Sequence, residues 1–141
     1  MSNNREKEMQ DVVNAGNEAL FYLVSAEEKL VSAKKWGIAD ILGGKIIVSA
    51  VKSDKVQQAK RDLAHATTAI QVLSKELLDL EQPYYQTLSV SDGLMAMDLF
   101  LDNFLLDIVT QQRINEALKE VQNLIAQVEG ILDAMATLPK E

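Results

Sequence analysis

The residues best suited to do chemistry in this chain are aspartates at helical spacing. Asp98 and Asp102 are four positions apart, so a helix would place both carboxylates on one face, with Asp107 roughly opposite. Like charges at that spacing repel each other. Binding of a metal ion through oxygen ligands, or a role of the two aspartates in acid–base chemistry, would explain why they occur together. Asp98, Asp102 and Asp40 are therefore candidate metal ligands. The alternative is that these acids meet water, or Lys and Arg from a neighbouring helix.

Other catalytic and metal-binding side chains are scarce. His65 is the only histidine and the chain has no cysteine, which excludes disulfides, thiolate metal sites and a cysteine nucleophile. The sequence also lacks the Glu-x-x-His motifs of bundle di-metal sites and any phosphate-binding loop. His65 is predicted to be a half-exposed helix residue rather than a ligand. The sequence thus favours a protein without catalysis and without a cofactor.

Composition predicts one soluble helical domain spanning residues 1–141. Hydrophobic residues make up 48% of the chain and charged residues 25%, with 2 prolines and 6 glycines, which favours helix throughout. The net charge of -7 opposes binding to nucleic acid. The polar start excludes a secretory signal, and no run of about 20 apolar residues predicts a membrane span, so a cytoplasmic location is expected.

Long amphipathic helices must position these residues. Apolar residues three and four apart predict one helix from about Met9 to Lys35, with an apolar face made of Met9, Val13, Gly16, Leu20, Leu23, Ala26 and Leu30. A second helix is predicted to start at Ser53-Asp54 and to end before Pro83. The second helix has the most regular apolar stripe, made of Val56, Ala59, Leu63, Ala66, Ile70, Leu73, Leu77 and Leu80. The short links predict antiparallel neighbours.

The C-terminal part of the chain predicts further helix. Residues 94–109 are apolar on nearly every side, and a polar stretch without a helix breaker follows. The next apolar stripe is made of Ile114, Leu118, Val121, Ile125, Val128, Leu132 and Met135, and Ala117, Leu124, Ile131 and Leu138 broaden it. Whether 91–138 is one helix or two stays open. The stripes at 56–80 and 114–135 are predicted to bury each other, as in coiled-coil packing, and a polar layer with Asp107 and Arg113 would fix their register.

The segment Trp36–Lys52 differs from the rest of the chain. It contains the only tryptophan and three of the six glycines, and it predicts a short glycine-containing helix or crossover between two long helices. If buried, it is a structural joint. If exposed, it is a binding segment for a protein partner or a membrane surface, although the acidic chain opposes anionic lipid. The candidate interaction residues are Trp36, Ile38, Ile41, Leu42, Ile47 and Val51.

Several of these features together resemble a known family. Trp36-Gly37, Asp40, Gly43-Gly44, the lysines at 52–55, the acids of 98–107 and Arg113-Ile114 resemble a family of small, uncharacterised all-helical bacterial proteins. The resemblance covers Ala19 to Leu132. It departs at Lys45 and at 51–53, where the family has a longer glycine run and a histidine. It implies a helical fold in the bacterial cytosol and supplies no activity or ligand.

The sequence therefore predicts an all-α antiparallel bundle of three to four long helices that acts as a protein-interaction or scaffold module. The apolar residues 94–109 suit a subunit interface, so a homodimer is one form of this prediction. One alternative is peripheral membrane association through 36–51. The other is a carboxylate-based metal or small-molecule site.

Overall fold

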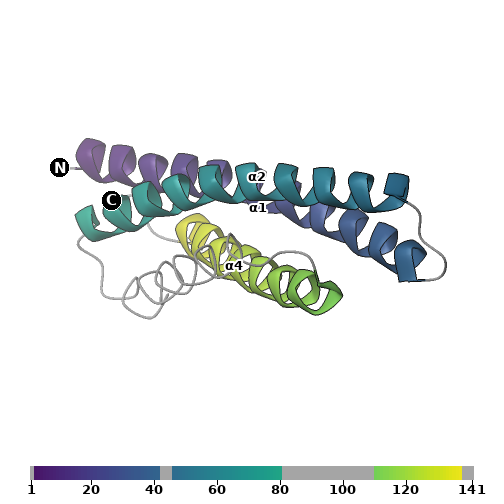
Figure 1. The fold of residues 1–141 in the computed structure, drawn as a ribbon. Coiled ribbons are helices and arrows are strands. Elements are labelled where there is room, and N and C mark those ends of the chain that lie inside the picture. The colour runs from purple at the N-terminus through teal and green to yellow at the C-terminus, as the bar shows by residue number, and fades with distance from the viewer. Residues whose placement is uncertain (1, 42–45, 81–109, 138–141) are drawn as a thin grey trace.

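The computed structural model describes residues 2–41, 46–80 and 110–137, with side chains described for 5–37, 51–80 and 110–137. These residues form three helices, α1 (Ser2–Ile41), α2 (Ile46–Asp79) and α4 (Gln111–Thr137), and contain no strand. Figure 1 shows α1 and α2 as a long pair with α4 against one side of it. The prediction of an all-α bundle is confirmed for these three helices.

α1 and α2 pack as antiparallel neighbours. The side chains of Ser25 and Lys29 in α1 reach Asp62 in α2, and Tyr22 in α1 stacks on His65 in α2, so the chain runs in opposite directions along the pair. The two helices therefore form a hairpin in which positions shortly before the turn face positions shortly after it (Figure 1).

The predicted stripe of α2 is the buried face of that helix. All eight of its residues, from Val56 to Leu80, are buried, and Ala69 joins them. In α1 the buried face has shifted from the predicted one, because Val13 and Leu20 are only partly buried while Val12, Ala15 and Ala19 are fully covered. Small alanines allow α1 and α2 to approach closely.

α4 packs against α1, whereas the sequence analysis paired its stripe with that of α2. The main contacts of α4 with the other described helices are with α1, and α4 runs antiparallel to it, with Gln111 at Lys34 and Leu132 at Gly16. Gly16 has no side chain, and a Cβ added there would lie 2.8 Å from Leu132 Cδ2. The glycine thus allows α4 to lie close to α1 at this point.

The buried residues of α4 form a single stripe with alternating three- and four-residue steps: Ile114, Ala117, Val121, Leu124, Val128, Ile131 and Met135. Leu118, Ile125 and Leu132, which the sequence analysis placed in the stripe, are partly buried at its flank. The predicted pattern had merged two neighbouring rows of the same helix. The spacing gives the helical period but not which row faces the neighbour.

Thr110 begins α4. Its hydroxyl accepts a hydrogen bond from the backbone N–H of Arg113 (3.2 Å), and its carbonyl accepts from Ile114 (3.1 Å). This is N-cap geometry, in which the side chain satisfies an amide that has no partner within the helix. A helix therefore starts at Gln111, and any helix within 91–109 lies outside the described residues.

The separate short helix or crossover predicted for 36–52 is not shown. Trp36–Ile41 continues α1 and Ile46–Lys52 begins α2, which leaves only 42–45 outside the described residues. The predicted restart at Ser53-Asp54 was wrong, because α2 runs through both residues. Both are exposed there, and Asp54 accepts a hydrogen bond from Gln58 one turn later (2.7 Å), so neither interrupts the helix.

Candidate functional site

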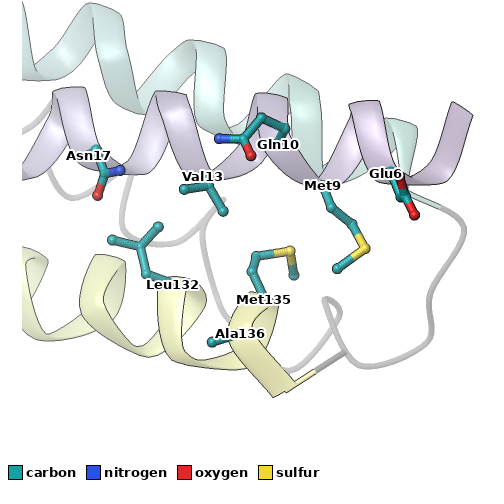
Figure 2. A pocket seen from close by; sticks show the side chains of 8 residues that line it. All are labelled: Glu6, Met9, Gln10, Val13, Asn17, Leu132, Met135 and Ala136. Carbon is teal, nitrogen blue, oxygen red and sulfur yellow. The ribbon is translucent and has the colours of Figure 1, made fainter. Parts of the chain in front are cut away.

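An open groove lies between the N-terminal half of α1 and the C-terminal end of α4. Its volume is about 460 Å³, and it is lined by Glu6, Met9, Gln10, Val13 and Asn17 of α1 and by Leu132, Met135 and Ala136 of α4. Figure 2 shows the side chains of Met9 and Met135 extending into the space between the two helices. We call this the α1–α4 groove.

The groove has an apolar floor and a polar rim. Met9 and Met135 are nearly fully buried at 6% and 4% exposure, Val13 and Leu132 are partly buried, and Glu6, Gln10 and Asn17 are exposed. Methionine side chains are unbranched and polarisable, so they adapt to ligands of differing shape. This arrangement suits an apolar group that enters between the helices, with polar contacts at its edges.

The same side of α1 remains apolar beyond the groove. Leu20 and Val24 continue the line of Val13 and Asn17 at helical steps of three and four. With Phe21, Ser25 and Glu28 they line a second, shallower hollow. Phe21 is 68% exposed and Val24 40%. We call this hollow the Phe21 surface.

The charged side chains at and next to the groove are mostly acidic in the described part of the chain. Glu6 stands on its rim in α1, and Glu129 and Asp133 are exposed on α4 within one turn of Leu132 and Ala136. None of the eight lining residues is basic. Of the neighbouring bases on α1, Lys7 pairs with Asp11 (3.6 Å) and Arg5 is half-buried. The groove therefore presents apolar surface bordered by carboxylates.

A polar cluster at the edge of the Phe21 surface joins α1 to α2. The Ser25 hydroxyl donates to Asp62 Oδ2 (2.6 Å), and the Lys29 ammonium donates to Ser25 Oγ (3.0 Å) and pairs with Asp62 Oδ2 (3.4 Å). Lys29 and Asp62 are each mostly covered, with side-chain exposures of 27% and 19%. Each group's charge is thus matched by the other, so the cluster fixes the register of the hairpin.

This cluster does not activate a nucleophile. A serine nucleophile requires a base that accepts its proton, and in a serine–lysine pair that base is a neutral amine. Here Lys29 Nζ lies 3.0 Å from Ser25 Oγ and 3.4 Å from Asp62 Oδ2, and the Ser25 hydroxyl itself donates to Asp62. A hydroxyl that already donates to a carboxylate and accepts from an ammonium is held as a structural bridge.

His65 belongs to an aromatic stack rather than to a ligand set. Its ring lies 4.8 Å from that of Tyr22 at an interplanar angle of 24°, and Phe21 meets Tyr22 edge-on at 5.2 Å. His65 is exposed on α2, in keeping with the prediction of a helix surface residue. The stack connects the hairpin interface to the Phe21 surface.

The predicted interaction residues of 36–52 are described only in part. Trp36 is 37% exposed near the end of α1, and Val51 is half-buried in α2. Ile38 and Ile41 lie in α1 and Ile47 in α2, and their side chains are outside the described set. Leu42 lies outside the described residues altogether. Trp36 and Val51 are both partly covered, and the choice between a structural joint and a binding segment stays a prediction.

The predicted carboxylate site also lies largely outside the description. Asp98 and Asp102 are in 81–109, and Asp40 lies in α1 without a described side chain. Over the parts of the chain that the structure describes, no group of three or more His, Cys, Asp or Glu is arranged to hold a metal ion. The same parts include no helix that is both long and apolar enough to cross a bilayer.

The predicted polar layer is described only at Arg113, because Asp107 lies outside the described residues. Arg113 pairs with Glu116 on the surface of α4 (3.6 Å), with both side chains well exposed. The amide of Gln111 instead connects α4 to α1, since its Nε2 donates to the Lys34 carbonyl (2.9 Å). The Gln111 Oε1 atom lies against Gly37, where a Cβ would collide with it. Gly37 is therefore a packing position within α1.

The α1–α4 groove and the Phe21 surface were not predicted from the sequence. Phe21 and Val24 lie outside the predicted apolar face of α1, and large apolar residues outside a stripe are the signal that points to them. A comparison of the chain with protein-family models, curated proteins and solved structures gives no match.

Proposed function

We propose that this chain is a protein-interaction module, a helical bundle that binds a partner protein through the outward side of α1 and does not act as an enzyme. The observation that carries this proposal is the exposure of Phe21 at 68% beside Val24 at 40%. Burying a phenylalanine side chain contributes about 1.5–3 kcal/mol, so leaving it in water is costly unless a partner covers it.

The surroundings of Phe21 support the proposal. Leu20 is partly buried beside it, and the adjacent α1–α4 groove extends the apolar surface along the same helix. Aromatic residues in the centre of a hollow with polar edges commonly dominate binding energy at interfaces. Ser25 and Glu28 supply such edges.

A matched pair of substitutions tests the proposal. Phe21→Glu places a charge in the surface, and Leu78→Glu makes a similar change on α2, where Leu78 is 69% exposed. Tagged full-length wild type and both variants are purified from cells that express the chain, and bound proteins are identified. We expect a partner that wild type and Leu78→Glu retain and Phe21→Glu loses. Equal retention by all three proteins would contradict the proposal, provided that circular dichroism shows equal helix content.

Peripheral membrane association is a second candidate, which the 37% exposure of Trp36 favours. Indole side chains suit the membrane interface, and Lys34 and Lys35 precede this one in α1. Sedimentation with vesicles of neutral and of anionic lipid, using wild type and Trp36→Ala, tests it. Equal and negligible binding by both proteins removes this candidate.

A further inference from the structure

Two rows of half-covered apolar residues border the seam between α1 and α4. Val13 and Leu20 of α1, and Leu118, Ile125 and Leu132 of α4, are partly buried and pack against the core. Within each helix these residues are seven positions apart, so each row follows one side of its helix. From Leu118 to Leu132 the row is about 21 Å long at 1.5 Å per residue.

The α1–α4 groove opens at one end of these rows. Val13 and Leu132 belong both to the rows and to the lining of the groove, which has a volume of about 460 Å³. An apolar side chain that enters there meets the two buried methionines, Met9 and Met135 (Figure 2). Two parallel apolar rows with a hollow between them have the shape that an amphipathic helix covers.

The charges of the groove discriminate between possible occupants. Glu6 is the charged residue among the eight that line it, Glu129 and Asp133 are exposed within one turn of its lining residues on α4, and the whole chain carries a net charge of -7. A second copy of this chain would bring the same acids to the contact, and like charges placed opposite each other are unfavourable. A basic partner would gain attraction both locally and over longer range.

We propose that the α1–α4 groove binds an amphipathic helix of a partner protein, with apolar residues at heptad spacing on one side and Lys or Arg beside them. This inference rests on the proposed function, because it names the class of partner for the same side of α1. The apolar residues of the partner helix cover Val13 and Leu132, and its basic residues meet the acids at the rim.

Two designed helical peptides of about 20 residues test the inference. At 1.5 Å per residue each is about 30 Å long, which is enough to cover the row of about 21 Å on α4. Both peptides carry the same leucines at heptad spacing, and one has Lys where the other has Glu. Binding to the full-length chain is measured from the anisotropy of a dye on the peptide. We expect the cationic peptide to bind at least about tenfold more tightly, with affinity that falls as salt is added.

Charge reversal at the groove should exchange this preference. The groove variant carries Glu6→Lys, Glu129→Lys and Asp133→Lys at three exposed positions. We expect this variant to bind the cationic peptide about tenfold or more weakly than wild type does, and to bind the anionic peptide more tightly.

A control variant separates local from overall charge. It carries lysine at three exposed acids that do not line the groove, Glu18, Asp54 and Asp79, and has the same net charge as the groove variant. We expect it to keep the wild-type preference. A neutral variant, Ala136→Trp, fills the groove without a change of charge and should weaken binding of the cationic peptide.

Several results would overturn the inference. Equal binding of both peptides to wild type would do so, and so would equal effects of the groove and control variants. Light scattering that shows a dimer in wild type and a monomer in Ala136→Trp would identify a second copy as the occupant. If neither peptide binds wild type while a Phe21-dependent partner is still captured, the docking of a basic helix fails and the proposed function stands.

Discussion

The close contact of Gly16 with Leu132 allows a quantitative test of how α4 is seated on α1. In an open helical position, Gly→Ala stabilises a protein by about 0.8–1.0 kcal/mol, because alanine has the higher helix propensity. At Gly16 the new methyl group would lie 2.8 Å from Leu132 Cδ2 and 3.2 Å from Cγ. Carbon atoms prefer separations of about 3.5–4.0 Å, so Leu132 or the helix must move.

The expected effect of Gly16→Ala follows from these two opposing terms. Forcing a methyl group into a packed contact costs about 1–3 kcal/mol. Subtracting the propensity gain of about 1 kcal/mol leaves a net destabilisation of about 0–2 kcal/mol. In the Leu132→Ala background the obstruction is absent, so Gly16→Ala should stabilise that variant by about 1 kcal/mol. The double-mutant cycle should therefore show a coupling of about 1–3 kcal/mol.

Gly130 supplies the matched control for this experiment. It lies in α4 with nothing within 4 Å of an added Cβ, so Gly130→Ala should stabilise the wild type by the propensity gain alone. Urea unfolding of the single and double variants, followed by circular dichroism, gives all the free energies. If Gly16→Ala stabilises wild type as much as Gly130→Ala does, the close approach of α4 to Gly16 is refuted.

Three further substitutions test the other contacts between the helices by the same measurement. Gly37→Ala displaces the Gln111 amide, so the loss of a hydrogen bond worth about 1 kcal/mol offsets the gain in helix propensity. In a Gln111→Ala background the same substitution should stabilise the protein by about 1 kcal/mol. Equal effects in both backgrounds would contradict this. Thr110→Ala should cost about 1 kcal/mol and Thr110→Ser much less, because serine keeps the capping oxygen; equal losses would rule out the cap. Ser25→Ala and Asp62→Ala should couple by about 1 kcal/mol across the hairpin, and a coupling near zero would mean that this hydrogen bond is not formed in solution.

The period of the apolar residues predicted the helices and the buried face of α2. Every residue of the predicted stripe from Val56 to Leu80 is buried, because alternating steps of three and four leave only one continuous face. The period of the apolar residues is less informative where two apolar rows are adjacent on one helix. In α4, Leu118 and Ile125 have the same period as Ala117 and Leu124, and only contact with α1 decides which row is covered.

The apolar stripes did not predict which helices pack against each other. The prediction that the faces of α2 and α4 bury each other was wrong, since α4 packs on α1 through Gly16 and Gln111. An apolar stripe indicates that one face of a helix must be covered, but it does not indicate which element covers that face. The end of the first helix was predicted near Lys35, whereas α1 runs to Ile41 and the Gln111 side chain packs against it at Gly37.

The candidate site was predicted least well. Binding residues were predicted at 36–52, and of these the described side chains are Trp36, which is exposed, and Val51, which is half-buried. The α1–α4 groove forms where residues more than 100 positions apart meet, such as Val13 and Leu132. Such a hollow depends on how two helices are seated, which a local pattern does not reveal.

The alanine-rich core has a calorimetric consequence. Eight of the 24 buried hydrophobic residues in the described part of the chain are alanine, and none is aromatic. The heat-capacity change of unfolding scales with the apolar area that becomes hydrated, and alanine exposes little area per residue. We expect scanning calorimetry to give a heat-capacity change at or below about 12 cal/mol/K per residue, the lower end of the usual range. The stability of this bundle should then vary little with temperature, and cooling should weaken it less than it weakens a protein with an aromatic core.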